Sequence, residues 1–244
     1  MDILMLFAAD ESALTLSEIS ARIDLHKSSV LRTLSTLAAS GILEKDTETG
    51  AYRLGLLILE LAGKVLDSYD FLEQAGPYLE QLAFETGEII HLSILDRGEI
   101  IYLDKKGEAK PLTVAARIGG RHPAYCSAMG KVLLSGLSPA EVESALGPGP
   151  YVRMTPNTII DPAQFGQILE CIRQDGYAID DEEAFPGIRC VAAPIKGQKG
   201  EILAAISATV PIQRMDKKRT MEICVLVKDA AQKISKRSVA GYIR

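Results

Sequence analysis

The chain has 244 residues, enough for two domains of ordinary size, and 47% of them are hydrophobic and 24% charged. This composition supports a packed core and excludes disordered and fibrous classes. The apolar runs are too short to span a membrane, since even residues 54–66 include Glu60 and Lys64. The formal net charge of −5 argues mildly against nucleic-acid binding, because phosphate-binding proteins usually present a basic face.

The terminus and the cysteines indicate where the protein works. The first residues, MDILMLFAADES, contain no basic region and no small-residue cleavage site, so we expect no secretion signal. The cysteines lie far apart without a C-x-x-C pair, which disfavours a disulfide framework or a zinc knuckle. We therefore expect reduced thiols in the cytoplasm. The three histidines show no ligand spacing, so we predict no metal. We also predict no cofactor.

Two short helices are predicted in the first quarter of the chain. Thr15-Leu16-Ser17-Glu18 fits a capping box, in which Thr15 accepts from a backbone amide while Glu18 reaches back. A second helix is expected from about Lys27 to Ala39, ended by Gly41 in the left-handed conformation that glycine tolerates. Two short helices joined by a tight turn form a helix-turn-helix.

The start of the second helix carries short hydroxyls and cations, which reach phosphates and base edges from the major groove. Residues 1–55 hold five basic side chains against eight acids, but no acid lies between Asp24 and Glu44. We predict that Lys27 contacts the DNA backbone and that the side chains facing the groove are Ser28, Ser29, Arg32 and Thr33.

A hairpin is predicted directly after the second helix. Residues 42–45 and 51–54 read as short strands around the polar turn 46–50. A hairpin in this place forms the wing of a winged helix, and we expect its Lys45 and Arg53 to contact the flanking DNA backbone. The alternative is a small helical domain with a hairpin that serves protein contact.

A largely apolar helix over residues 56–70 is predicted to link the winged helix-turn-helix domain, 1–55, to a larger domain, 71–244. This linking helix packs either against a twin, which gives a dimer, or on its own domain. The larger domain shows hairpins with helices at either side, which predicts an α+β fold around a mainly antiparallel sheet. Strands are expected at 89–95, 100–103, 112–116, 191–195 and 202–210, with a further short strand after Gly176 that ends at Asp180. Helices are expected at 71–86, 127–134, 138–146, 162–174 and 216–235.

The chain contains, in this order, the stretches LSEISARIDLHKSSVLRTLSTLAASGILEKD, YRLG, YLEQLAFETGEIIHLSILDRGEIIYLDK, AYCSAMGKVLLS, DGYAIDDEEAFPGIRCVAAPI and GEILAAISAT. Their order and spacing resemble the IclR family of bacterial transcriptional regulators across nearly the whole chain. The resemblance implies a winged helix-turn-helix, a linking helix and a GAF-like effector-binding domain. It also implies a homodimer or homotetramer on double-stranded, palindromic operator DNA. We expect a repressor controlled by a small organic-acid effector, with no membrane partner.

The start of the helix after Cys126 is a candidate anion site. A serine there caps the helix, and the free amides attract an anion such as an effector carboxylate. An ordinary structural cap is the alternative. The residues predicted to hold the carboxylate are Ser127, Ala128, Met129 and Gly130.

Polar side chains also mark the strand at 202–210. Ser207 and Thr209 alternate with apolar residues and face one side, where they either satisfy each other or line a pocket. By the resemblance, Asp180, Cys190, Ser207 and Thr209 occupy effector-pocket positions, and we expect Asp180 to accept a hydrogen bond from an effector hydroxyl. Cys190 as a nucleophile or redox switch is the alternative, but no histidine has a recognisable catalytic spacing to it.

Two other classes of function remain as alternatives. An enzyme fused to a DNA-binding domain is disfavoured, because the chain has no Walker loop and no G-x-G-x-x-G, H-E-x-x-H or G-x-S-x-G motif. A pure protein-interaction module would use the hairpin and the linking helix as contact surfaces. Salt-dependent binding to a promoter fragment separates the expected regulator from both.

Overall fold

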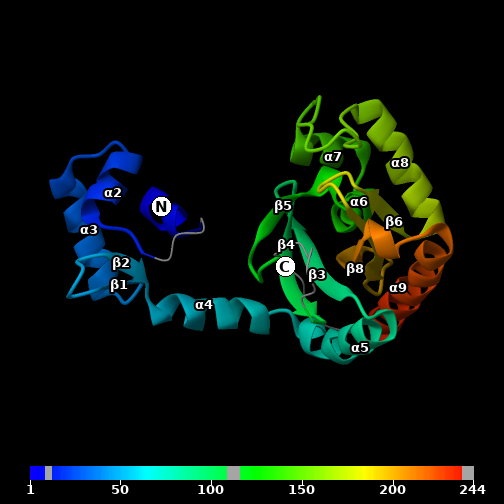
Figure 1. Cartoon of the computed structure of the whole chain (residues 1–244), viewed down its shortest axis with the longest axis horizontal. Helices are drawn as coiled ribbons and strands as arrows, with labels where there is room; N and C mark the ends of the chain where they lie inside the picture. The colour runs from blue at the N-terminus through cyan, green and yellow to red at the C-terminus, as the bar shows by residue number, and fades with distance from the viewer. Residues whose placement is uncertain (9–12, 109–115, 238–244) are drawn as a thin grey trace. The chain divides into compact units, whose positions relative to one another are not determined.

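The computed structural model describes residues 1–8, 13–108 and 116–237 (Figure 1). The chain forms two compact units: unit 1 is Met1–Ser68, and unit 2 begins at Tyr69. Among the described residues, no helix combines the length and the apolar character needed to cross a lipid bilayer.

Unit 1 is a small helical core with a hairpin. Ile19 and Leu34 are completely buried, and Val30 is nearly so, which confirms the inward faces of the two predicted helices. The capping box is also confirmed: the Glu18 amide donates to Thr15 Oγ1 at 3.4 Å, and the Thr15 amide donates to Glu18 Oε2 at 2.7 Å. The helices are α1 (Asp2–Met5), α2 (Leu16–Arg22), α3 (Lys27–Ala39) and α4 (Leu56–Asp67), with a 3-10 turn at Leu6–Ala8.

The predicted hairpin is present as β1 (Leu43–Lys45) and β2 (Tyr52–Leu54), which pair antiparallel. Leu14 adds a single bridge to Tyr52, so the buried Tyr52 ring ties the hairpin to the helical core. The turn is closed by Asp46, whose carboxylate accepts from two backbone amides of the turn. Unit 1 is thus a winged helix-turn-helix, as predicted.

Unit 2 is built on one six-stranded sheet in which every neighbouring pair is antiparallel. The strand order is β5-β4-β3-β8-β7-β6, so the centre joins segments that are distant in the sequence. The strands are β3 (Ile89–Asp96), β4 (Glu99–Lys106), β5 (Arg121–Pro123), β6 (Ala178–Asp181), β7 (Ile188–Lys196) and β8 (Ile202–Pro211).

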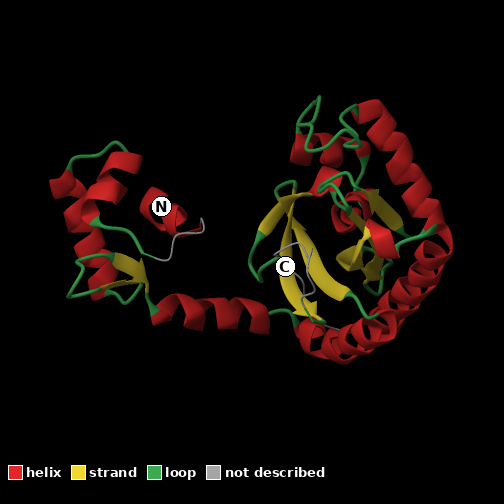
Figure 2. Ribbon diagram, in the orientation of Figure 1, coloured by secondary structure: helices red, strands yellow, loops and turns green. Residues whose placement is uncertain are grey.

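Helices cover both faces of this sheet (Figure 2). The long helices α5 (Asp70–Thr86) and α9 (Lys217–Arg237) pack together on one face. On the other face α6 (Ala128–Ser135) lies against the central strands, and α8 (Pro162–Asp175) packs on α6. The remaining elements are α7 (Pro139–Leu146) and 3-10 turns at Ala124–Cys126 and Ile212–Arg214. The predicted α+β class is confirmed.

Two strands differ from the prediction. Residues 112–115 of the predicted strand at 112–116 lie outside the described residues, and Ala116 belongs to no strand. Strand β5 was not predicted, because three residues that end in a proline give no alternating pattern. Such a segment suits the edge of a sheet, where a missing amide donor costs least.

Candidate functional site

A narrow pocket lies between the start of α6, the central strands and the loop that joins β6 to β7. Its free volume is about 20 Å³, which is room for one or two waters. A larger guest therefore has to displace side chains of the wall. The residues that line the pocket are His91, Tyr102, His122, Ser127, Ala128, Met129, Asp180, Ala184, Phe185, Cys190, Ser207 and Thr209.

The structure brings seven of the eight predicted effector-binding residues to this pocket, and Gly130 is the exception. A Cβ atom at Gly130 would lie 2.1 Å from the Ala124 carbonyl oxygen. The glycine therefore lets α6 approach the preceding 3-10 turn, which is a packing role. Ser207 and Thr209 do face the same side of β8, as their alternation predicted.

The start of α6 combines a structural cap with a pocket wall. Ser127 is the N-cap residue, and its Oγ accepts a hydrogen bond from the Gly130 amide at 3.0 Å. The first amides of a helix, here those of Ala128 and Met129, have no partner within the helix. Both residues line the pocket, so an anion in it would meet two amide donors and the positive end of α6.

A buried network of charges adjoins the pocket. Lys131 forms an ion pair with Glu183, and the two side chains are only 2% and 8% exposed. Asp180 accepts a hydrogen bond from the Glu183 amide at 2.7 Å. Burial raises the pKa of Asp180 to about 7, although the positive charge of Lys131 acts in the opposite direction. Asp180 is therefore divided between its two protonation states at neutral pH.

His91 connects the pocket to the centre of the sheet. Its Nδ1 lies 3.1 Å from Thr209 Oγ1, and its ring meets the Tyr102 ring edge-on at 5.2 Å. Burial lowers the pKa of His91 to about 4, so the ring is neutral at pH 7. In the sequence, His91 is considered only as a metal ligand or catalytic residue, and its position in the pocket is not predicted. Its place inside the apolar strand IIHLSIL is the available signal, because a buried histidine needs hydrogen-bond partners.

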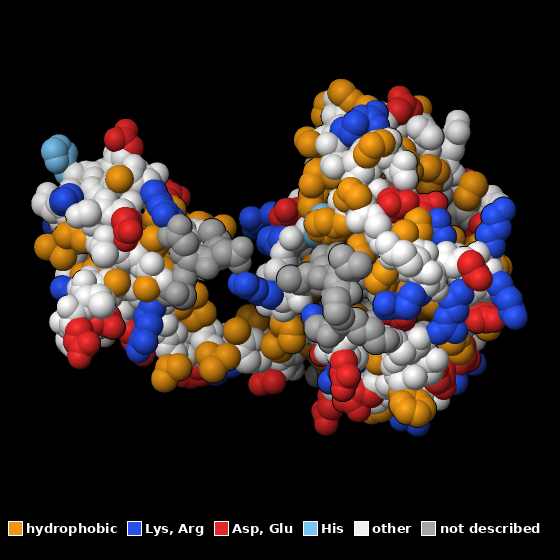
Figure 3. Space-filling view, in the orientation of Figure 1, with side chains coloured by type: hydrophobic (Ala, Val, Ile, Leu, Met, Phe, Trp, Pro, Cys, Tyr) orange, Lys and Arg blue, Asp and Glu red, His pale blue; other side chains and the backbone are white. Residues whose placement is uncertain are grey.

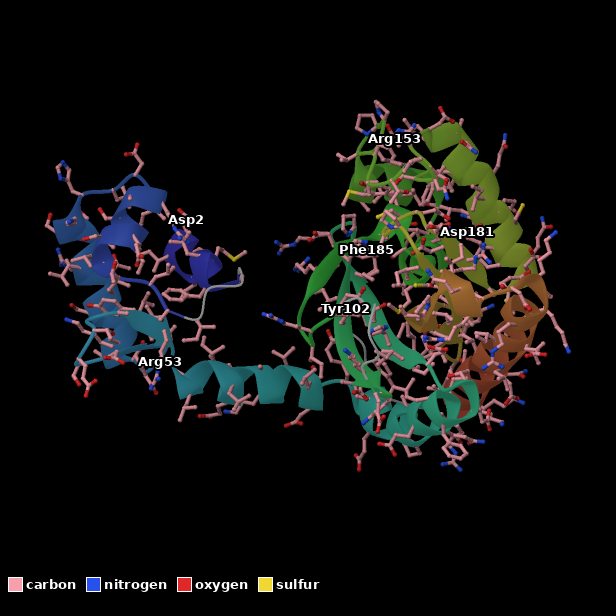
Figure 4. The ribbon with its side chains drawn as sticks, viewed as in Figure 1. Asp2, Arg53, Tyr102, Arg153, Asp181 and Phe185 are labelled. Atoms are coloured by element: carbon pink, nitrogen blue, oxygen red, sulfur yellow. The ribbon has the colours of Figure 1, made fainter. Side chains whose placement is uncertain are left out.

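His122 and Phe185 bound the pocket on its outer side. Their rings stack at a centroid distance of 5.2 Å, and Phe185 is 38% exposed. Figure 4 labels Phe185 on the β6–β7 loop and Tyr102 on β4, the two aromatic margins of the pocket. Phe185 belongs to a loop, and loops are in general more mobile than the strands that they connect.

The cysteine chemistry does not suit a nucleophile. Burial raises the pKa of Cys126 to about 12 and also raises the pKa of Cys190, whose thiol donates to Thr209 Oγ1 at 3.6 Å. Thiols in such surroundings stay protonated and unreactive. Within the described ranges, no three side chains of histidine, cysteine, aspartate or glutamate gather where they would hold a metal ion.

The predicted DNA-reading residues lie on the surface of unit 1. Those on α3 occupy its first two turns, where Lys27 Nζ lies 2.9 Å from Ser17 Oγ. In the hairpin, Arg53 pairs with Glu44 at 2.9 Å, and Lys45 lies over the Tyr52 ring. The exposed predicted residues are Lys27, Ser28, Ser29, Arg32, Thr33, Lys45 and Arg53.

Comparison with known proteins agrees with both units. The family model of the C-terminal domain of the bacterial transcriptional regulator IclR matches residues 63–236, and the IclR helix-turn-helix family model matches residues 1–47. The chain belongs to the IclR family. Among curated IclR-family relatives, the Escherichia coli transcriptional regulator KdgR is 34% identical, over 93% of this chain and 86% of its own length. BhcR of Paracoccus denitrificans is 36% identical, with coverages of 96% and 84%.

Solved IclR-family structures share the fold. An IclR homologue from Microbacterium hydrocarbonoxydans, complexed with 4-hydroxybenzoate, aligns with a TM-score of 0.86 and 27% identity over 96% of this chain and 95% of its own. The Thermotoga maritima IclR aligns with a TM-score of 0.80 and 27% identity, with coverages of 99% and 96%. The resemblance seen in the sequence is confirmed. The curated relatives are transcriptional regulators, not enzymes.

Proposed function

We propose that this IclR-family regulator is a repressor whose operator binding is controlled by a small organic acid held in the pocket. The observation that carries the proposal is the meeting of two opposite kinds of polar group in one small space. Amide donors stand at the start of α6, and Asp180 is nearly buried at another part of the wall.

The two groups suit the two ends of one effector. The amides of Ala128 and Met129 bind its carboxylate. Asp180 would repel that carboxylate if both were ionised and close together, so it bonds instead with a hydroxyl at the far end of the molecule. Ser207, Thr209 and Cys190 then contact the middle. The structural relative complexed with 4-hydroxybenzoate carries an acid of this class, with a hydroxyl opposite the carboxylate.

On the DNA side, α3 enters the major groove. Ser28, Ser29, Arg32 and Thr33 are exposed on its first turns and read base edges, while Lys27 contacts a phosphate. The hairpin places Lys45 and Arg53 beside the flanking backbone. Regulation of bacterial promoters puts this function in the cytoplasm.

The protein acts as a homodimer or homotetramer. One recognition helix reads too few bases for a specific operator, so paired half-sites need paired subunits. Among its described residues, α4 buries none, and Leu56, Leu59 and Val65 are 75%, 71% and 57% exposed. Figure 3 shows hydrophobic side chains gathered along this helix. An apolar helix of this kind fits packing against its twin.

The test measures operator binding and effector response in matched variants. An operator is first selected by the wild-type protein from a random DNA pool, and a panel of small organic acids is screened by thermal shift for a stabilising ligand. We expect Asp180→Ala to bind the operator but to lose its response to that acid. Ser207→Ala should weaken the response less, because it removes one neutral hydrogen bond of about 1 kcal/mol.

Asp181→Ala is the control, because this neighbouring carboxylate points to the surface and pairs with Arg189. It should respond as the wild type does. An unchanged response in Asp180→Ala would place the effector elsewhere. Deletion of the gene should raise transcription from the selected operator, and lowered transcription would contradict the repressor assignment.

A further inference from the structure

Among the residues that the structure describes, one buried polar atom at the pocket has no hydrogen-bond partner. His91 is 2% exposed and lines the pocket, and among the described residues nothing bonds to its Nε2. The other ring nitrogen is engaged by Thr209. A buried polar atom in a native protein almost always has a partner, so one that faces a cavity without a protein partner is available to a molecule bound there.

The surrounding hydrogen bonds decide which nitrogen carries the proton. Thr209 Oγ1 accepts from the Cys190 thiol and lies against His91 Nδ1. Thr209 is only 5% exposed, so its own hydroxyl hydrogen needs an acceptor inside the protein. Among the described contacts of Thr209, the acceptor that can receive it is Nδ1. An imidazole that accepts at Nδ1 and is neutral carries its hydrogen on Nε2.

We propose that His91 is a specificity-determining residue, which donates from Nε2–H to an uncharged oxygen of the effector, the hydroxyl oxygen apart from its carboxylate. This inference rests on the proposed function, since it concerns the same pocket. A neutral imidazole gives a single directional donor and no net charge. The acids Asp180 and Glu183 nearby disfavour a second carboxylate in the same space. The effector class is therefore a monocarboxylic acid with one further oxygen.

Two substitutions separate this role from a merely structural one. Asparagine at position 91 keeps a polar atom near the place of Nδ1, for Thr209, but loses the donor at Nε2. Glutamine keeps a donor near the place of Nε2, because its amide reaches that far, but it loses the polar atom near the place of Nδ1. His91→Asn and His91→Gln are therefore a matched pair, and urea unfolding of each shows whether the fold survives.

The ligand test uses pairs of acids that differ by one hydroxyl oxygen: lactate with propanoate, 2-hydroxybutanoate with butanoate, and 4-hydroxybenzoate with benzoate. We expect the wild type to bind the oxygenated member of at least one pair about tenfold more tightly, as one hydrogen bond provides. His91→Asn should lose that preference while it still binds the other member as the wild type does. His91→Gln should keep most of the preference.

The outcomes distinguish this inference from the proposed function. If the wild type binds acids without an oxygen preference, or if His91→Asn keeps the preference, the role of His91 is refuted while the acid effector stands. If the wild type binds neither member of any pair, both are refuted. The tautomer has its own test, because the protein has only three histidines and ¹⁵N shifts identify each ring. A His91 protonated at Nδ1 in the free protein would also overturn the inference.

Discussion

The Lys131 ammonium lies against the Glu183 carboxylate, and this ion pair is almost entirely buried beside the pocket. Lys131 also donates to the Ile179 carbonyl, so the cation is held from two sides. The backbone amide of Glu183 in turn donates a hydrogen bond to the Asp180 carboxyl group. One lysine thus offsets the charge of the two acids beside the pocket in which we propose that the effector binds.

Removal of this lysine should destabilise the fold strongly. In Lys131→Met, two buried acids lose their only described cationic neighbour, and breaking a buried pair from one side costs about 3–5 kcal/mol. The double variant Lys131→Met/Glu183→Gln should recover most of this loss, because no unpaired charge is left. Urea unfolding at pH 7 measures both. A loss below about 1 kcal/mol in the single variant would show that the acids are protonated without the lysine.

The stability of the protein should carry a pH dependence that Asp180 causes. Its pKa is near 7 in the fold and near the ordinary aspartate value of 3.8 in the unfolded chain, so the folded state binds more protons between these values. The contribution of Asp180 to the free energy of unfolding is therefore largest below about pH 4. It falls as the pH rises towards about 7 and does not change further above that. Asp180→Asn should remove this component, on the order of 1–4 kcal/mol. The measurement is the difference between wild-type and variant unfolding free energies from pH 4 to 8, and a difference that does not change with pH would contradict it.

Gly130 should be intolerant of any side chain. An added Cβ would meet the Ala124 backbone at 2.1–2.5 Å, so α6 has to shift, and Gly130→Ala should cost at least about 2 kcal/mol. Gly166→Ala is the control, because this glycine lies inside α8 and an added methyl group would have no atom within 4 Å. It should stabilise the protein by about 0.5–1 kcal/mol. Equal thermal melting temperatures for the two variants would refute the packing role.

Glu44 should restrain DNA binding through Arg53. These residues pair across the hairpin at 2.9 Å, so in the proposed DNA complex Glu44 would compete with a phosphate for the Arg53 guanidinium (Figure 4 labels Arg53). Glu44→Gln should tighten binding to all DNA sequences and steepen the slope of log K against log salt by about 0.9, the value for one more phosphate contact. Glu60→Gln removes the same charge from a pair on α4 and should change the slope less. Equal changes would indicate net charge alone.

The parts of the fold that the sequence could predict depend on local signals. The capping box at Thr15 and the helical stripe through Val30 and Leu34 lie within single elements, so they are visible without the rest of the chain. The alternation of Ser207 and Thr209 likewise predicts one shared face of a strand.

The parts that were missed depend on partners far away in the chain. Lys131 meets Glu183 across 52 residues, and His91 meets Thr209 across 118. A lysine in an apolar helix and a histidine in an apolar strand show that polar partners are needed, but the sequence does not say which. Only the strand order, with β3 beside β8, and the packing of α6 on the sheet bring His91 and Thr209 to the pocket and the Lys131–Glu183 pair close to it.

The small free volume of the pocket sets a threshold for sensing. An acid of several heavy atoms cannot enter about 20 Å³ until the wall opens, so its apparent affinity is the intrinsic one reduced by the fraction of molecules that are open. The stacking of Phe185 on His122 affects the fraction of molecules in which the wall is open. Neither ring is one of the polar groups that we propose hold the acid. If the proposed function holds, substitutions in the β6–β7 loop should change the concentration at which the regulator responds, while the polar groups that select the acid stay as they are.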